Sequence, residues 1–341
     1  MSKVVYLLGA GASFGTRENG IGSPILTGLP IVSEIGGELE NIASLLDSLP
    51  LNDKELEECK QNLIKDFQDL KDHCAGITID SYARELWLQK DMQGFSRVEL
   101  LLTIFFIFEQ IIHKPDSRYK FFLLKVAQRD NVYDALEFSP EIGILSWNYD
   151  NQIELAYRQF FGDNYSYIRE RLGIYDVKDY EQKQHSQKYC NIIKLNGTAN
   201  FTQEEDWLRS SDNNTLDETM LKMVLKNYVE CMQTWACYGM LRLNFAWDDW
   251  WSKDMRTNKI PKLVHDTQTL VVIGYTFPDY NREIDRIIFE NMANLRNIYI
   301  QDPFASRIVQ NISTVIPQGR VTKIDIHQRT DVDQFLLPIE L

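Results

Sequence analysis

The chain contains few of the features that mark specialised classes of protein. Its five cysteines are odd in number and include no C-x-x-C pair, so we predict neither a zinc ribbon nor a disulfide framework. We find no internal repeat and no low-complexity linker in the sequence. The first residues, Met-Ser-Lys, run directly into an apolar strand and show no signal-peptide pattern. These absences favour a reducing, cytoplasmic compartment.

Basic residues and long hydrophobic runs are also scarce. The formal net charge is −13, and because phosphate contacts require clustered Lys and Arg, we expect no direct binding of nucleic acid. The most apolar stretch, residues 100–108, lies between Glu99 and Glu109 and is far shorter than the ~20 residues that a bilayer requires. We therefore expect no membrane contact and interpret this stretch as a buried helix, with an oligomer interface as the alternative.

What is present is the alternation of strands and helices that is typical of an α/β protein. Apolar and β-branched runs predict strands at residues 4–8, 142–147, 191–195, 269–273, 297–300 and 321–326. Helical patterns separate most of them, which predicts a Rossmann-like, doubly wound parallel sheet with ligands at the carboxyl ends of the strands. We further predict helices at residues 151–160, 216–239 and 283–292, and a docked helix at residues 335–338.

One interval departs from this alternation. Between the first two strands we find only helical periodicity, so residues 31–138 are predicted to form a helical insertion. Residues 1–30 and 139–341 would then form the sheet domain. An aromatic cluster at Phe245, Trp247, Trp250 and Trp251 is expected to pack in a core, since two aspartates lie beside it.

The first predicted strand runs into the glycine-rich turn Gly9-Ala10-Gly11-Ala12-Ser13. Glycines after a buried strand let backbone N–H groups approach a pyrophosphate closely. The dinucleotide fingerprint has a glycine at its sixth position, where this chain has Phe14. The turn therefore predicts nucleotide binding, and the alternative is a tight strand-to-helix connection without a ligand.

Polar residues follow four further strands. Asn148 and Asp150 follow residues 142–147 and are candidates for catalysis, with capping of the next helix as the alternative. Asn196 and Gly197 follow residues 191–195 in the same way.

Two more strand ends add to this set. Gly274 and Tyr275 follow residues 269–273, and Asp302 follows residues 297–300, where an acidic group can accept hydrogen bonds from ribose hydroxyls. We expect all of these strand ends to converge at one edge of the sheet.

Together these segments resemble the sirtuin-like domain of bacterial anti-phage defence proteins. The resemblance rests on Gly9-Ala10-Gly11-Ala12-Ser13, Gly28-Leu29-Pro30, Asn148-Tyr149-Asp150, Lys194-Leu195-Asn196-Gly197 and Ile273-Gly274-Tyr275, in the family's order. It implies a Rossmann-like sheet with a helical insertion, and a bound NAD+ that many members hydrolyse to ADP-ribose and nicotinamide. The pyrophosphate would lie on the glycine turn, and Asn148 and Asp150 would lie near the nicotinamide ribose. Pro30, Gly197, Gly274, Tyr275 and Asp302 complete the expected NAD+ site, and no metal is expected.

The chain departs from the family's pattern at three points. Asn196 stands where the family has a histidine that is regarded as the base or ribose-binding group. The zinc ribbon of the protein deacetylases is missing, and Ile31 follows Pro30 where they have an arginine, so peptide deacetylation is disfavoured.

The change at Asn196 bears most on function. An amide accepts no proton near neutral pH, and a base contributes about 10²–10⁴-fold to a rate. A deliberate replacement of the histidine, made to trap substrate, would also place an asparagine at this position. Of the five histidines, only His185 is near this turn in sequence, and its neighbours suggest a solvated loop.

Two classes of function follow. The first is a cytoplasmic NAD+ hydrolase that acts as a defence effector, restrained in a homo-oligomer or by an ATPase or nuclease-like partner. The second is a catalytically weak or inactive module that binds NAD+ or ADP-ribose and regulates a partner. An α/β protein that binds no dinucleotide is the third, plainest alternative.

Overall fold

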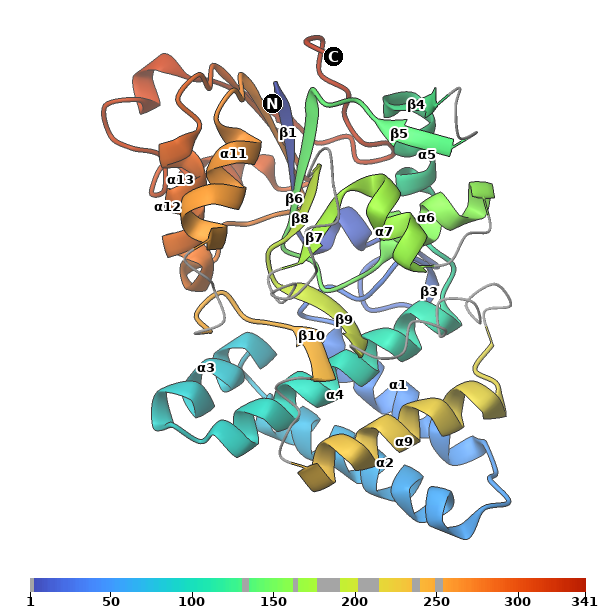
Figure 1. The fold of residues 1–341 in the computed structure, drawn as a ribbon. Helices are drawn as coiled ribbons and strands as arrows, with labels where there is room; N and C mark the ends of the chain where they lie inside the picture. The colour runs from blue at the N-terminus through green and yellow to red at the C-terminus, as the bar shows by residue number, and fades with distance from the viewer. Residues whose placement is uncertain are drawn as a thin grey trace.

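The central element of the fold is a seven-stranded parallel sheet (Figure 1). The computed structural model describes residues 3–130, 135–161, 165–176, 191–201, 215–234, 240–248 and 254–341. In spatial order the strands are β13 (Asp325–Arg329), β12 (Asn297–Gln301), β11 (Thr269–Ile273), β1 (Val4–Leu8), β6 (Ile142–Ser146), β8 (Ile192–Lys194) and β7 (Ile174–Asp176), and each neighbouring pair is parallel. The predicted α/β class with a Rossmann-like, doubly wound sheet is confirmed.

Helices cover both faces of the sheet, which is why its inner strands are continuous apolar runs. Val5 and Leu7 of β1 face a core formed with α11 (Ile260–Val264), α12 (Arg282–Asn291) and α13 (Ala305–Ile312). Val4 and Tyr6 face the opposite core, formed with α5 (Ser117–Val126), α6 (Gln152–Phe161) and α7 (Tyr165–Leu172). Figure 1 shows these two sets of helices on opposite sides of the sheet.

A helical lobe follows the first strand, but it is shorter than the insertion expected at residues 31–138: α5 packs on the sheet, and residues 127–130 and 135–138 form short strands in place of a helix. It contains α1 (Ile35–Ser48), α2 (Lys54–His73), α3 (Ile79–Gln89) and α4 (Met92–Ile112), and α9 (Glu218–Thr234) packs against them. Polar residues cap the amino-terminal ends of three of these helices. The side chains of Asp53, Thr78 and Asp91 accept backbone hydrogen bonds at the starts of α2, α3 and α4. In Figure 1 the lobe lies below the sheet.

The apolar run at residues 100–108 lies within α4 and is buried throughout inside this one chain. It forms the core of the helical lobe, so the interface alternative has no exposed surface there. No helix in the described ranges combines the length and apolarity that crossing a bilayer would need. Of the aromatic cluster, Phe245 is buried and stacks on Trp247 with ring centroids 4.9 Å apart, whereas Trp250 and Trp251 lie outside the described residues.

The described residues also form three short antiparallel ribbons. They pair β2 (Thr16–Arg17) with β3 (Ile25–Thr27), β4 (Ala127–Asp130) with β5 (Ala135–Phe138), and β9 (Gly197–Phe201) with β10 (Leu241–Leu243). β9 follows β8 directly and contributes Ala199 and Phe201 to the core of the helical lobe. This ribbon therefore connects the carboxyl edge of the sheet to the lobe.

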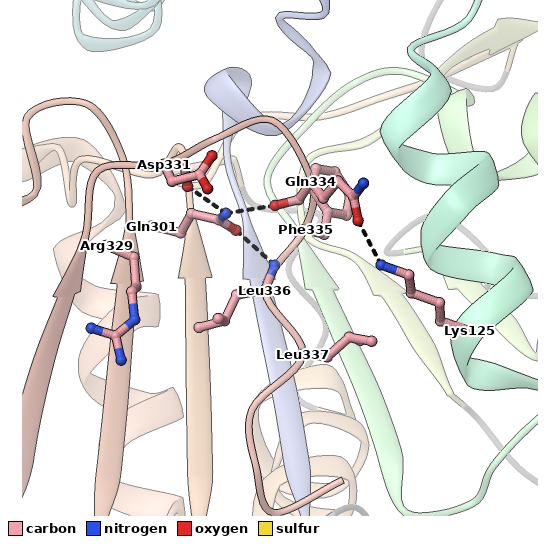
Figure 2. A pocket seen from close by; sticks show the side chains of 8 residues that line it. All are labelled: Lys125, Gln301, Arg329, Asp331, Gln334, Phe335, Leu336 and Leu337. Atoms are coloured by element: carbon pink, nitrogen blue, oxygen red, sulfur yellow. Dashed lines mark hydrogen bonds between the residues drawn. The ribbon is translucent and has the colours of Figure 1, made fainter.

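Two predictions were wrong near the end of the chain. The strand expected at residues 321–326 begins only at Asp325, because Val321–Lys323 forms a 3₁₀ turn. The helix expected at residues 335–338 is absent from this described stretch: Phe335 is buried, but these residues form neither helix nor strand. Backbone groups of this described segment bond the Gln301 side chain and not one another. Gln301 Nε2 donates to the carbonyl oxygens of Asp331 and Gln334, and Gln301 Oε1 accepts from Leu336 N (Figure 2).

Candidate functional site

The order of the strands places a change of direction beside β1. The chain proceeds from β1 to β6 on one side, and it later returns to β11 on the other side. In doubly wound sheets, ligands bind at the carboxyl ends of the strands at such a point. The turn after β1 begins at Gly9 and the turn after β11 begins at Gly274, so both predicted glycine turns lie here.

The glycines in these turns are required by close backbone packing. A Cβ at Gly9 would lie 2.6 Å from the Gly274 carbonyl oxygen, and a Cβ at Gly11 would lie 2.7 Å from Gly274 Cα. Gly274 itself has φ +58°, a left-handed conformation that favours glycine. The two turns therefore interlock, and this packing by itself requires the glycines.

This packing uses several of the amide groups that were expected to receive a phosphate. Gly9 N–H donates to Ile273 O at 3.0 Å, Gly11 N–H to Gly274 O at 3.1 Å, and Ala12 N–H to Gly9 O at 2.8 Å. Ala10–Ser13 form a single 3₁₀ turn. The glycine turn therefore offers a phosphate fewer free backbone N–H donors than a turn whose amides all face a ligand.

Two residues that the sequence analysis did not identify support the glycine turn from α5. Arg118 Nη2 donates to the carbonyl oxygens of Gly11 and Ala12, at 3.1 and 3.2 Å. Asp116 pairs with Arg118 and also accepts from Gly15 N at 3.0 Å. Asp116 is recognisable in the sequence as a helix cap, but its contact with a turn so distant in sequence is not.

Asn148 joins the end of β6 to the same turn. Its buried amide Nδ2 donates to Gly9 O at 2.9 Å and to Ser13 Oγ at 3.0 Å. Ser13 Oγ also lies 2.9 Å from the Tyr119 hydroxyl. Asn148 and the glycine turn, which the sequence analysis proposed independently, are thus in direct contact.

Asp150 is buried nearby, and part of its role is capping. Its Oδ1 accepts from Gln152 N at 3.1 Å at the start of α6, as the capping interpretation predicts. Burial raises the pKa of the Asp150 carboxyl, while the Lys194 ammonium and a hydrogen bond from Ser13 oppose that rise. Ionising this carboxyl therefore costs more free energy than ionising an exposed aspartate.

Lys194 and Glu154 form a buried ion pair beside Asp150. Lys194 Nζ lies 3.1 Å from Glu154 Oε2 and donates to the Asp150 carbonyl oxygen at 2.6 Å, and both side chains are almost entirely inaccessible. The sequence analysis assigned Lys194 only to a motif and did not find Glu154. The pair fixes the backbone at Asp150 against the end of β8.

Asn196 is buried, and only one end of its side-chain amide is hydrogen-bonded within the described residues. Its Nδ2 donates to Trp147 O at 2.9 Å, and within the described part of the chain its Oδ1 has no partner. Asn244 N donates to the Asn196 carbonyl oxygen at 2.9 Å, and Asn244 Oδ1 likewise has no partner among those residues. Leaving a buried acceptor unpaired costs about 1–3 kcal/mol, so a hydroxyl or amide that reached either oxygen would gain a favourable hydrogen bond.

The histidines offer no substitute base among the described residues. His185 lies outside the described ranges. The other four lie beside other residues: His73 beside Asp69, His265 beside Asp266, His327 beside Asn297, and His113 beside Glu109.

The side chain of Tyr275 points away from the glycine turn. Its hydroxyl donates to Asp285 Oδ2 of α12 at 2.8 Å, and Trp147 Nε1 donates to Asp285 Oδ1 at 3.3 Å. Burial raises the pKa of Asp285 to about 8, although the Tyr275 and Trp147 hydrogen bonds lower it. Tyr275 therefore contributes its backbone to the turn and its hydroxyl to a buried network.

The remaining expected residues are distributed around the same edge. Pro30 is buried next to Leu29, whose N–H donates to Ser13 O at 2.7 Å. Gly197 has φ +65°, and a side chain there would collide with the backbone of β10. Asp302 lies one strand beyond β11 and accepts from Phe304 N at 2.7 Å, so its Oδ1 already has a local role.

Helix α3 of the insertion contacts this edge of the sheet. The Tyr149 hydroxyl donates to Asp80 Oδ1 at 3.3 Å, and Ser81 Oγ lies 3.0 Å from the Tyr280 hydroxyl. Arg84 lies over the Trp247 ring, 5.5 Å from its centroid. The helical lobe thus touches the segments that follow β6, β10 and β11.

A separate pocket of about 250 Å³ lies beside the carboxyl-terminal segment (Figure 2). Its lining includes Lys125, Arg329 and Asp331, and it contains none of the described residues expected to bind NAD+. This pocket is distinct from the site at β1 and β11.

Comparisons of the chain with protein-family models, with curated proteins and with solved structures gave no match.

Proposed function

We propose that the chain binds NAD+ at the carboxyl edge of β1, β6 and β11 and hydrolyses it to ADP-ribose and nicotinamide. The observation that carries this proposal is the Asn148 amide, which bonds both Gly9 O and Ser13 Oγ. The bond joins the glycine turn and the Asn148-Tyr149-Asp150 strand end, two segments of the sirtuin-like pattern, into one site. As in sirtuin-like defence proteins, the activity would serve an anti-phage response.

The residue types suit the chemistry of this reaction. Nicotinamide leaves with the electron pair of its glycosidic bond, and positive charge develops at the ribose carbon before water adds and releases a proton. An enzyme assists by holding the ribose and placing negative charge near that carbon. In our proposal Asp150 supplies the carboxylate, Asn148 orients ribose or water, and Asn196 Oδ1 accepts from a ribose hydroxyl.

Asn196 favours a second candidate function. An amide accepts no proton from water, so this turn lacks a general base. A module that binds NAD+ or ADP-ribose, with little or no turnover, would keep every binding contact described above. Its occupancy would be transmitted to a partner.

Restraint is part of the hydrolase proposal, because uncontrolled loss of NAD+ would harm the cell. We place that restraint in a homo-oligomer or in a partner of ATPase or nuclease-like type. The α3 contacts to Tyr149 and Tyr280 are the intramolecular elements on which such a partner would act.

The test is direct. The full chain is titrated with NAD+ in a calorimeter, and nicotinamide release is followed by chromatography for the natural sequence and for Asn148→Ala, Asn196→His and Asn294→Ala. Asn294 is exposed and far from the site, so its variant is the matched control. We expect binding and slow release, loss of release in Asn148→Ala, and faster release in Asn196→His.

Three outcomes separate the candidates. Binding without release, with release appearing in Asn196→His, overturns the hydrolase and supports the binding module. Absence of NAD+ binding by a folded protein overturns both. Equal release by Asn148→Ala and Asn294→Ala overturns the role given to Asn148.

A further inference from the structure

Three potential metal ligands meet where α1 approaches the end of α4. Glu109 and His113 lie one turn apart on α4, with Glu109 Oε2 and His113 Nε2 separated by 3.5 Å. Glu38 on α1 completes the group, and one ligand atom from each residue lies within 4.8 Å of the others. The sequence analysis expected no metal and did not single out these residues.

The buried carboxylate of Glu109 is the independent observation that points to a ligand. Its side chain is 0% exposed, yet within the described residues neither of its oxygens has a hydrogen-bond partner, and the same holds for His113 Nε2. Two other buried carboxylates in this chain have clear partners: Glu34 bonds Arg17, and Asp66 bonds Arg97 and Tyr228. Burying a carboxylate without a partner is costly, so Glu109 requires a counter-charge or a proton.

Arg17 does not provide the counter-charge. Arg17 acts electrostatically on Glu109, but its guanidinium donates to the carboxylate of Glu34 and to the carbonyl oxygens of Phe14 and Leu29. A proton is the other possible occupant, since burial raises the pKa of Glu109 well above its ordinary range. The experiment below distinguishes the proton from a metal.

We propose that Glu38, Glu109 and His113 bind a divalent transition-metal ion. Two carboxylates balance a 2+ charge, and the imidazole selects Zn²⁺, Co²⁺ or Mn²⁺ over Mg²⁺ and Ca²⁺, which prefer oxygen ligands. Glu38 and His113 are partly exposed, so the ion enters from their side, and water occupies the remaining positions. Among divalent ions that suit these ligands, Zn²⁺ is expected to bind more tightly than Mn²⁺.

The position of the group links it to the glycine turn. Immediately after His113, Lys114 O accepts from Gly28 N at 2.8 Å, and two residues later Asp116 begins the contacts that hold Gly15. On the other side, Gln110 Oε1 accepts from Asn151 N at 2.6 Å, next to Asp150. A metal at this point would fix the end of α4 from which both supports extend.

The test uses tag-free full-length protein freed of metal by a chelator. Titration with Zn²⁺, Co²⁺ and Mg²⁺ is followed by calorimetry and by thermal unfolding, and Co²⁺ adds a visible absorption that reports its ligand set. The variants are Glu38→Gln and Glu109→Gln, with Glu40→Gln as the control, since Glu40 lies on the same helix but faces Lys71.

We expect one equivalent of Zn²⁺ or Co²⁺ to bind and raise the melting temperature, and Mg²⁺ to have no effect. Glu38→Gln should weaken Zn²⁺ binding by at least about tenfold. Loss of a residue that only supports a ligand already weakens metal binding by about 10–100-fold, and Glu38 is proposed as a direct ligand. Glu40→Gln should bind as the natural sequence does. Glu109→Gln keeps the shape of the side chain, so a folded variant that no longer binds Zn²⁺ supports the site.

Two results would overturn the proposal. One is Zn²⁺ binding that is the same in Glu38→Gln, Glu109→Gln and Glu40→Gln, which would assign the ion to other residues. The other is no stoichiometric binding of Zn²⁺ or Co²⁺ by the natural sequence, which would assign Glu109 a proton. Neither result depends on whether the chain binds NAD+.

Discussion

Asn148 Nδ2 lies 2.9 Å from the carbonyl oxygen of Gly9, so a side chain at the end of β6 holds the turn at the end of β1. The two residues are far apart in sequence, but β1 and β6 are adjacent and in register through Leu8 and Ser146. This contact determines the relative positions of the two segments on which the proposed NAD+ site depends.

Replacing Asn148 by Ala should therefore weaken both stability and binding. Gly9 O and Ser13 Oγ lose a donor in a buried place, and we expect a loss of about 1–3 kcal/mol in the free energy of unfolding. Urea unfolding measures this loss, and Asn294→Ala should be neutral. Equal stability of the two variants would contradict the role of this hydrogen bond.

The interlocked glycine turns predict opposite outcomes for two Gly→Ala substitutions. In Gly11→Ala the new Cβ would lie 2.7 Å from Gly274 Cα, so the backbone must shift and the protein should lose several kcal/mol or fail to fold. In Gly37→Ala, within α1, the Cβ meets nothing within 4 Å, and the protein should gain about 0.5–1 kcal/mol. Thermal unfolding of both variants tests this, and comparable effects would contradict it.

The buried pair Lys194–Glu154 should respond differently to single and double substitution. Lys194→Met leaves Glu154 buried without its cation, and we expect a loss of about 3–5 kcal/mol. The double variant with Glu154→Met should recover most of this loss, because two apolar side chains of similar size pack without a charge.

The control for that pair is an exposed one. Lys222 and Glu218 pair on the surface of α9, and Lys222→Met should cost only about 0–1 kcal/mol. Denaturant unfolding of all three variants gives the comparison. A single Lys194→Met effect as small as that of Lys222→Met would mean that the buried pair contributes little.

Asp285 predicts a pH dependence of stability. Its pKa in the folded protein is about 8, whereas the unfolded chain releases this proton near the ordinary value for aspartate. The contribution of the Asp285 proton to the free energy of unfolding is therefore fully present at low pH. It is lost as pH rises towards 8, by about 1.4 kcal/mol per pH unit.

Asp285→Asn removes this titration but retains a side chain that can bond Trp147 and Tyr275. Its free energy of unfolding should fall less than that of the natural sequence between about pH 6 and pH 8. Asp279→Asn, at an exposed site in the same segment, is the control and should keep the natural slope. Parallel slopes for all three proteins would show that Asp285 is already ionised in the fold.

The sequence predicts the sheet well where strands are buried on both faces. β1, β6 and β11 are continuous apolar runs, and their observed limits match the expected ones within one residue. β7 has only three residues, and β9 begins at Gly197 and carries Thr and Asn, so neither shows an apolar run. Their positions depend on pairing and on contacts with the lobe, which periodicity does not report.

For the site, local motifs identify the turns but not what supports them. Asn148 follows a strand and Ser13 belongs to a glycine turn, so both could be identified from neighbouring residues. Arg118 reaches Gly11 from another helix, and Tyr275 turns its hydroxyl towards Asp285. The orientations of these two side chains depend on tertiary packing, so no local sequence pattern predicts them.

The central place of β1 in the sheet has a consequence for synthesis of the protein. Its partners begin only at Ile142 on one side and Thr269 on the other, so β1 is made before either of them. At about 5–20 residues per second, its two edges stay unpaired for many seconds on the ribosome. The nascent chain therefore keeps at least one edge of this apolar strand unpaired until β11 has been made.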